Sequence, residues 1–329
     1  MKNNHFDVII IGAGPAGASC ANELVKNGVK TLVIEKKKLP RYKCCAGLLN
    51  DNVQEFILEN FEKIPSELKS VNQSLRITKN LKRFVELPIN TICVERYKLD
   101  NWLIKKSKVK IIESSRYIKH YYSNGNIIIK TNNNFNEVEY SCSYLIGADG
   151  GYSSIRRQID PDYILDNMLI NKQLIYSGNS NIDNEYFNFV KNKKYSDAIA
   201  WFFLRNNLIH IGCSYLAKKN KDNNYLKLLF NDLSEEFHIK KCNLKKQIVC
   251  LSDSRGNENK FNFGDNNILL VGEACGLVSS LGEGIYQALH SGKQAALAII
   301  SSNNTIVEYK KRIQQEKEKI LQSFEVIIS

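Results

Sequence analysis

Residues 6–17 read FDVIIIGAGPAG, a run of apolar and mostly β-branched residues that leads directly into a glycine-rich turn. Residues 18–28 have the apolar spacing of an amphipathic helix that ends in glycine, and residues 31–35, TLVIE, form a second apolar run. A strand, a helix and a strand in this order make a βαβ unit. This stretch therefore predicts an α/β domain built on a parallel sheet.

The GAGPAG turn has the spacing of a dinucleotide-binding fingerprint. Gly12 makes the tight turn, Gly14 lets the backbone approach a pyrophosphate, and Gly17 lets the helix pack closely on the strand. The pyrophosphate is expected at the helix N-terminus, where unpaired N–H groups and the helix dipole favour negative charge. We place Ala16, which lies in this turn, in the same site.

Glu35 ends the second strand, 18 residues after Gly17. An acid at this place accepts hydrogen bonds from ribose hydroxyls, and its charge disfavours a 2′-phosphate. NAD or FAD is therefore favoured over NADP, but the fingerprint alone does not choose between them. Lys36, the next residue, is included in the expected cofactor site.

Farther along the chain, two strand-like runs are joined by Ser-Asn-Gly at residues 123–125, a strong hairpin signal. Residues 198–204 and 208–216 are typical of paired strands, and residues 222–237 are typical of a helix. The strand-then-glycine pattern returns in LLVGEACG, residues 269–276. We therefore expect an α/β nucleotide domain that is interrupted by a second domain rich in antiparallel strands.

The length of 329 residues suffices for about two domains. Lys and Arg exceed Asp and Glu by 46 − 34 = 12, and this positive charge favours anionic partners. Nucleotide phosphates, an acidic electron-carrier protein and peripheral contact with an anionic membrane surface all fit it. Nucleic acid is not expected, because no basic stripe with interleaved aromatic residues is present.

The nine cysteines show no CxxC spacing, and their odd number argues against a disulfide framework. We therefore expect a reducing cytoplasm and no metal site. No apolar run approaches the roughly 20 residues that span a bilayer, and no signal peptide is read. The five histidines lie far apart without a paired acid at catalytic spacing, which favours surface or core positions over a general base.

Two further motifs point to a family: GADGGYSSIRR at 147–157 and GDNNILLVGEACGLVSSLGEGIYQALHSG at 264–292. With GAGPAG and Glu35 they resemble, in order and spacing, the flavoproteins related to para-hydroxybenzoate hydroxylase, and among these the geranylgeranyl reductase-like branch. That branch carries K-P-C-G-G, then R-x-x-x-D, then G-D/E-A-A-G followed by E-G-I. The matching segments here are Lys43–Gly47, Arg96–Asp100, Gly272–Gly276 and Glu283–Ile285.

The resemblance implies FAD as the cofactor. It also implies a Rossmann-like FAD-binding domain of the para-hydroxybenzoate hydroxylase type, interrupted by a smaller α+β substrate domain with an antiparallel sheet. The expected FAD-binding domain is 1–48, 92–158 and 254–305, the substrate domain is 49–91 and 159–253, and a C-terminal helix covers 306–329.

The cofactor contacts that the resemblance implies beyond the fingerprint are Cys45, Ala46, Gly47, Arg96, Asp149, Gly272, Glu273, Gly284 and Ile285. Glu273 would hydrogen-bond the ribityl chain, and residues 284–285 would begin a helix whose N–H groups face the flavin pyrimidine edge. Arg96 would contact the flavin nucleotide, although its spacing alone suits a solvated helix arginine. Asp149 suits either a cofactor contact or a cap on the following turn.

Cys45 takes the place of the family cysteine and is the candidate catalytic residue, because this stretch should run along the FAD towards the flavin ring. Its role is either to polarise or shield the substrate or to fill space. Cys44 stands where the family has proline and is expected to be packing. Ala46 stands where the family usually has glycine, which puts the fit of the substrate over the ring in question.

The resemblance favours an FAD-dependent reductase that transfers hydride from flavin N5 to a carbon–carbon double bond of an apolar, isoprenoid or lipid-like substrate. The run Trp201–Leu204 would line an apolar tunnel or form ordinary strand core. The alternatives are an FAD-dependent monooxygenase that hydroxylates an aromatic or other small molecule, and a non-catalytic flavin- or lipid-binding protein. No second GxGxxG is present, so a transient electron donor, NAD(P)H or an acidic carrier protein, is expected to dock.

Overall fold

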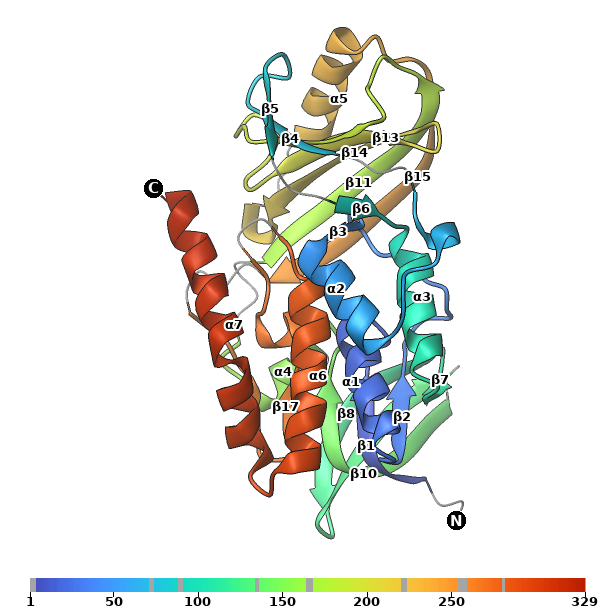
Figure 1. Ribbon diagram of the computed structural model, residues 1–329, viewed down its shortest axis with the longest axis vertical. Coiled ribbons are helices and arrows are strands. Elements are labelled where there is room, and N and C mark those ends of the chain that lie inside the picture. Colours follow the sequence, from blue (N-terminus) through green and yellow to red (C-terminus); the bar gives the residue numbers. More distant parts are fainter. Residues whose placement is uncertain are drawn as a thin grey trace.

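The structure is a computed structural model that describes residues 4–70, 74–87, 91–133, 136–163, 168–219, 224–253, 259–279 and 282–328. Its first sheet has the strand order β16-β17-β10-β1-β2-β7, with β8 and β9 added beside β10 (Figure 1). The parallel strands are β1 His5–Ile11, β2 Thr31–Ile34, β7 Lys110–Ile112, β10 Asn136–Gly147 and β17 Ile268–Leu270. The antiparallel ones are β8 Ser115–Ser123, β9 Asn126–Asn133 and β16 Gly264–Asp265. The parallel sheet predicted from residues 6–35 is thus confirmed.

The hairpin predicted at residues 123–125 is confirmed as well. Ser123 of β8 pairs with Asn126 of β9. Asn124 and Gly125, which connect them, have φ values of 47° and 75°. Left-handed backbone at both central residues is what a tight two-residue hairpin turn requires, and Asn-Gly adopts it readily.

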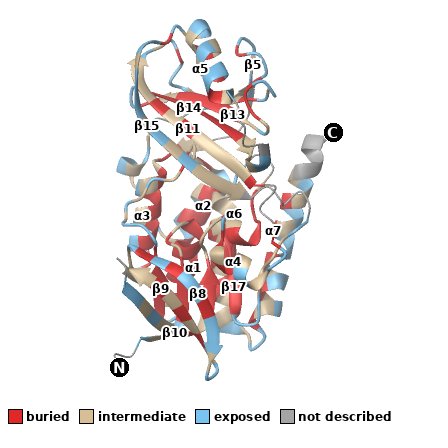
Figure 2. Ribbon diagram, turned by 180° about the vertical axis from the view of Figure 1, so that it is seen from behind, coloured by how far each residue is buried: buried red, intermediate tan, exposed pale blue. Residues whose placement is uncertain are grey.

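Helices cover the face of the first sheet that lies opposite β8 and β9, as Figures 1 and 2 show from the two sides. They are α1 Pro15–Lys26, α2 Asp51–Asn60, α3 Arg96–Lys106 and α6 Ile285–Ser301, and α7 Thr305–Ile328 lies along α6. Helices α1 and α6 cross so closely that a Cβ on Gly292 would lie 2.2 Å from the Ala16 carbonyl oxygen. The buried Tyr309 hydroxyl donates to the Leu270 carbonyl at 2.9 Å and ties α7 to β17.

The second sheet has the order β15-β11-β14-β13-β12-β4-β5, antiparallel except where β4 meets β12. Its strands are β4 Ser74–Thr78, β5 Phe84–Leu87, β11 Met168–Asn179, β12 Tyr186–Val190, β13 Ala200–Arg205, β14 Leu208–Leu216 and β15 Lys240–Asp253. The paired strands expected at 198–216 are β13 and β14. Helix α5, Tyr225–Glu236, matches the helix expected at 222–237 and lies over the outer face of this sheet (Figure 1).

The aromatic run on β13 divides between the two faces of the second sheet, because successive side chains of a strand point in opposite directions. Phe202 is fully buried in the core under α5. Trp201 and Phe203 point the other way and join a smaller cluster that includes Cys44. The packing that was expected of Cys44 is therefore present, and the strand-core alternative for the run holds for Phe202.

Shorter elements connect the sheets. Strands β3 Leu48–Asn50 and β6 Thr91–Cys93 pair with each other, and α2 packs its apolar side chains Val53, Phe56 and Ile57 into the core of the first sheet. The remaining short helices are Ser66–Leu68, α4 Ser154–Ile159, Ala217–Lys219 and Gly272–Cys275. The architecture agrees with the expected α/β fold carrying a second, antiparallel sheet; the exact domain boundaries stay a prediction. Within the described ranges, no helix combines the length and apolarity needed to cross a bilayer.

Candidate active site

The three glycines of the GAGPAG turn are needed for different structural reasons. A Cβ on Gly12, whose φ is +111°, would lie 2.3 Å from the Ala148 carbonyl oxygen, and one on Gly17 would lie 2.0 Å from the Gly12 carbonyl oxygen. The backbone of the chain itself therefore requires both glycines. Gly14 has an ordinary φ of −82°, and among the described residues a Cβ there would meet only the Arg41 guanidinium within 4 Å, at 3.6 Å. The space beside Gly14 is thus left for a ligand.

Glu35 is 3% exposed at the end of β2 and is held on both oxygens. Oε2 accepts a hydrogen bond from the Ala13 N–H, and Oε1 accepts one from the Lys37 N–H, each at 3.0 Å. Arg41 Nε forms an ion pair with Oε2 at 3.1 Å. Oε2 is occupied by two donors, but Oε1 has a further lone pair, so the predicted ribose contact remains open to Oε1. Lys36 beside it is exposed.

Arg41 and Arg96 meet at Asp100. Arg96 donates from Nε and Nη2 to the two Asp100 oxygens at 3.0 and 3.2 Å, and Arg41 Nη1 donates to Oδ2 at 3.1 Å. The R-x-x-x-D spacing places Arg96 and Asp100 one turn apart on α3. Burial alone would lower the Arg96 pKa, but Asp100 and the neighbouring Cys45 raise it above its usual value. At 7% exposure Arg96 is not a solvated helix arginine, and its predicted flavin contact stays a prediction.

Asp149 uses one oxygen as a cap and leaves the other buried. Oδ2 accepts from the N–H groups of Ser154 and Ile155 at 2.7 and 3.4 Å, at the start of α4. Oδ1 is buried and has no hydrogen-bond partner among the described residues. Burial raises the pKa of this carboxyl group. The cap alternative is therefore real, and the second oxygen remains available to a cofactor.

Lys43 and Glu273 form an ion pair of 3.3 Å between the loop after β2 and the turn after β17. Glu273 raises the pKa of Lys43. Farther along, Gly284 is the N-cap of α6, which begins at Ile285 and has no side-chain cap there among the described residues. The N–H groups of its first turn are therefore open to an acceptor.

Two of the predicted cofactor residues, Gly47 and Gly272, are required by the packing of the chain. A Cβ on Gly47, whose φ is +71°, would lie 1.9 Å from the Val94 carbonyl oxygen. Gly272 has a φ of +62°, and a Cβ there would lie 3.1 Å from the buried Ala16 methyl group. The Gly47 N–H also donates to Cys45 Sγ at 3.3 Å and so fixes that thiol. These glycines therefore hold the backbone around the site in place by close packing.

The chain fits a dinucleotide at the carboxyl ends of β1, β2 and β10. Positions 14, 150 and 284 share an open surrounding: a Cβ at any of them would come no closer than 3.6 Å to a protein atom. Asp149, whose buried Oδ1 has no partner among the described residues, belongs to the turn after β10, and Glu35 lies where a ribose acid belongs. Arg41, which the sequence analysis missed, joins them; its only sequence signal is a basic residue six positions after Glu35.

The loop of residues 41–47 is held against the second sheet. Arg205, at the end of β13, donates from Nη1 to the Ala46 carbonyl at 2.9 Å. The Cys250 thiol of β15 donates to the Cys44 carbonyl at 3.7 Å. Cys45 is consequently placed between the dinucleotide region and the sheet.

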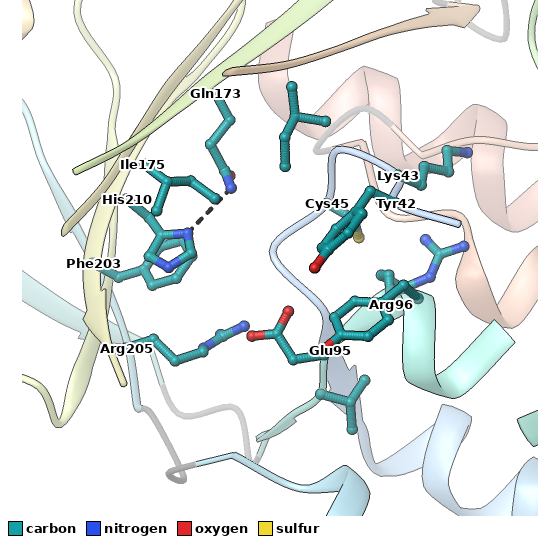
Figure 3. A pocket seen from close by; sticks show the side chains of 13 residues that line it. Tyr42, Lys43, Cys45, Glu95, Arg96, Gln173, Ile175, Phe203, Arg205 and His210 are labelled. Atoms are coloured by element: carbon teal, nitrogen blue, oxygen red, sulfur yellow. Dashed lines mark hydrogen bonds between the residues drawn. The ribbon is translucent and has the colours of Figure 1, made fainter. Parts of the chain in front are cut away.

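A pocket lies between this loop and the sheet, as Figure 3 shows. Tyr42, Lys43 and Cys45 lie on its loop side, and Glu95 and Tyr97 come from the start of α3. The sheet contributes Gln173, Ile175, Phe203, Arg205, His210 and Ile248. The pocket therefore combines apolar walls with several polar groups.

Of the sheet residues of the pocket, Phe203 was a candidate from the sequence, within the run Trp201–Leu204, and the others were not. His210 on β14 lies between Ile175 of β11 and Phe203 of β13 in the register, and its ring stacks on Phe203 with centroids 4.4 Å apart. His210 belongs to the five histidines that were expected at surface or core positions. It is 7% exposed, so the burial was anticipated, but its place on the pocket wall was not. Only the pairing of three distant strands creates that place.

Comparisons with known proteins agree with this geometry. A family model described as an FAD binding domain matches residues 5–59. The uncharacterized protein Mbar_A1602 of Methanosarcina barkeri is 30% identical over 312 residues, which cover 90% of this chain and 75% of that protein.

Solved structures share the fold. A geranylgeranyl bacteriochlorophyll reductase-like protein from Thermoplasma acidophilum superposes with a TM-score of 0.84 and 21% identity, covering 97% of this chain and 85% of the other. Aklavinone-11 hydroxylase, solved with FAD and aklavinone, gives a TM-score of 0.72 and 13% identity, covering 97% of this chain and 68% of the other. These likenesses extend over both sheets.

Proposed function

Because this chain belongs to the geranylgeranyl reductase-like family of FAD-dependent oxidoreductases, we propose that it reduces a carbon–carbon double bond of an isoprenoid or lipid-like substrate. FAD held in this site would supply, once reduced, the hydride for one alkene carbon, and a proton from water would reach the other carbon, so that the double bond becomes a single bond.

The observation that carries this proposal is the pocket between the cofactor-side loop and the second sheet. Ile175, Phe203 and Ile248 give it an apolar wall of the kind that a hydrocarbon chain requires. Cys45 lies opposite, on the loop that leads from the dinucleotide region (Figure 3). A substrate in this pocket would therefore lie between the sheet and the cofactor.

The residues around the cofactor region have separable tasks in this proposal. Glu35 and Arg41 orient the nucleotide, and the open first turn of α6 offers N–H groups to the flavin as negative charge develops on it. The Lys43–Glu273 ion pair closes the region from the loop side. Cys45, fixed by the Gly47 N–H, shields the reacting carbon atoms from water.

The reaction can be tested without knowledge of the natural electron donor. FAD-loaded enzyme, reduced chemically under anaerobic conditions, is mixed in turn with geranylgeranyl diphosphate and with polyprenyl compounds that carry a carbonyl group next to a double bond, and product mass and flavin oxidation are followed. We expect a mass gain of two hydrogens for each flavin oxidised. If no polyprenyl compound reoxidises the reduced enzyme, the proposal fails.

Cys45→Ser tests the thiol, with Cys242→Ser as the matched control because Cys242 is half-buried outside the pocket. Retained FAD with lost turnover only in Cys45→Ser supports a role beside the substrate. Equal rates in both variants would make Cys45 a packing residue.

A monooxygenase is the second candidate, since the fold is shared with aklavinone-11 hydroxylase and the pocket holds polar groups suited to an aromatic substrate. Rapid mixing of the reduced enzyme with oxygen separates the two. Oxygen consumption coupled to hydroxylation of an added aromatic compound favours the monooxygenase, whereas slow, uncoupled oxidation favours the reductase.

A further inference from the structure

Three side chains of the second sheet form a directed hydrogen-bond relay that ends at the pocket. Trp201 Nε1 donates to Gln173 Oε1 at 2.9 Å, and Gln173 Nε2 lies 3.2 Å from His210 Nδ1. An indole N–H can only donate, so the Gln173 oxygen must be the atom that faces Trp201. The Gln173 NH₂ group therefore faces His210 and donates to Nδ1.

This direction assigns the tautomer of His210. A neutral imidazole carries its proton on one nitrogen only, so an accepting Nδ1 leaves the proton on Nε2. Burial, and then the nearby positive charge of Arg205, lower the pKa of His210 to about 3. Other charged groups at the pocket are Lys43, Glu95 and Arg96. At neutral pH the ring is consequently uncharged, with an N–H at Nε2.

The Nε2–H group is not used by the chain. His210 lines the pocket, its ring is held flat against Phe203, and Nε2 makes no hydrogen bond within the described ranges. Figure 3 shows the ring across the pocket from Cys45 and Tyr42. A histidine with only a core role would satisfy both nitrogens inside the protein, because a buried polar group without a partner is costly.

Gly212 makes the relay possible. It lies opposite both Trp201 and Gln173 in the sheet register. A Cβ at this position would lie 2.2 Å from the Trp201 ring, so only glycine lets the indole lie across β14. Strand β14 therefore has no side chain at the point where the indole crosses it to reach Gln173.

We propose that His210 Nε2–H donates a hydrogen bond to the oxygen of a carbonyl group conjugated to the reacting double bond, which makes the substrate an α,β-unsaturated carbonyl compound. The inference rests on the proposed reduction. Hydride adds to the β-carbon, the π electrons move to the carbonyl oxygen, and His210 stabilises the resulting enolate. The α-carbon then takes a proton from water and the carbonyl re-forms. Gln173 and Trp201 are positioning residues that hold the tautomer.

The first measurement needs no substrate. Nitrogen-15 NMR of FAD-loaded protein with labelled histidine reports the tautomer, and the spectrum of His210→Phe identifies the His210 signals among those of the five histidines. We expect neutral imidazole with the proton on Nε2 throughout pH 5 to 9, and a mixture of tautomers in Trp201→Phe, where the amide can turn. A proton on Nδ1 in the unaltered protein overturns the proposal.

The second measurement is binding to the oxidised, FAD-loaded enzyme, where no turnover occurs. The probes are trans-cinnamaldehyde and trans-β-methylstyrene, which differ in a formyl against a methyl group. We expect His210→Phe, which keeps the stacking surface, to weaken cinnamaldehyde binding about tenfold and to leave methylstyrene binding unchanged. The control is His290→Phe, because His290 is stacked on Tyr286 outside the pocket.

Each result decides. Loss of the aldehyde preference in His210→Phe alone, together with a lower carbonyl stretching frequency of cinnamaldehyde bound to the unaltered enzyme, supports the assignment. The assignment is overturned if the unaltered enzyme binds the two probes equally or does not bind cinnamaldehyde, or if His290→Phe loses the aldehyde preference to the same extent. If the proposed reduction is wrong, the anaerobic assay will show no reduction of any alkene, while the His210 tautomer and the aldehyde preference will persist. That outcome would refute the proposed reaction but not the role of His210 as a hydrogen-bond donor.

Discussion

Asp100→Asn tests the buried charge network that connects the nucleotide region to Cys45. Asp100 is 1% exposed and accepts hydrogen bonds from Arg96 and Arg41 at 3.0 to 3.2 Å. With Glu35 bound to Arg41, the network contains two guanidinium groups and two carboxylates and is neutral. The substitution conserves size but leaves one positive charge uncompensated.

The expected loss follows from burial. Removing one partner of a buried ion pair costs about 3 to 5 kcal/mol, because the other charge stays out of water without compensation. Glu35 still compensates Arg41, and the asparagine oxygen still accepts one hydrogen bond. We therefore expect the lower end, a loss of about 3 kcal/mol in the free energy of unfolding. FAD affinity should fall too, since Arg41 flanks the space beside Gly14.

Urea unfolding followed by far-ultraviolet circular dichroism measures this loss, with the same free FAD concentration in every sample because ligand binding adds to stability. The control is Glu139→Gln, which breaks the exposed Lys130–Glu139 pair at 3.1 Å. Screening by water should make that change too small to measure. A loss below about 1 kcal/mol for Asp100→Asn, or one no larger than the control, would refute the reasoning.

Three further predictions concern the cofactor, pH and the electron donor. Gly14→Val should raise the dissociation constant of FAD by at least about tenfold in a fluorescence titration. The free energy of unfolding of the apoprotein, measured in urea, should stay within about 1 kcal/mol of the parent value. Unchanged FAD binding would contradict the conclusion that the space beside Gly14 holds the cofactor. Burial lowers the pKa of His210 to about 3 and that of His290 to about 4, so between these values and 6.5 the unfolded chain binds protons that the folded chain does not. The free energy of unfolding should therefore fall as pH drops from 6.5 to 5, by up to about 1.4 kcal/mol per pH unit for each histidine. The fall should be less steep in His210→Phe, and an identical slope in that variant would contradict the assignment of this pH dependence to His210. If an acidic carrier protein is the electron donor to this +12 chain, the flavin reduction rate should fall steeply with salt, and a salt-independent rate would point to NAD(P)H.

The nucleotide half of the fold could be predicted because its signals are local. A strand, a glycine turn and a helix lie within residues 6–28, and Gly17 is required by the backbone of this same turn, although Gly12 is required by the distant Ala148 carbonyl. The second sheet was only partly foreseen: β13 and β14 are consecutive and were found as a pair. Strands β11 and β15 were not assigned, because they pair across some 70 residues and β15 carries many lysines.

The site residues also divide into those with a local sequence signal and those set by long-range contacts. Glu35 could be chosen from its place at the end of a strand and Asp149 from the family motif, and both lie at the nucleotide edge of the sheet. Arg41 was missed because its value comes from Glu35 and Asp100, and Asp100 is 59 residues away. Gly47 and Gly272 carried the family motif, but the structure gives each a packing reason.

The sequence by itself determined the cofactor class and the parallel sheet, because a dinucleotide is recognised by a turn, a helix end and an acid that are close together in the chain. Only the tertiary structure decided what lines the pocket. The register of β11, β13 and β14 places His210 between Ile175 and Phe203 and lets Trp201 reach Gln173 over Gly212. Such a wall has no local signature, because strand pairing, and not spacing along the chain, brings its side chains together.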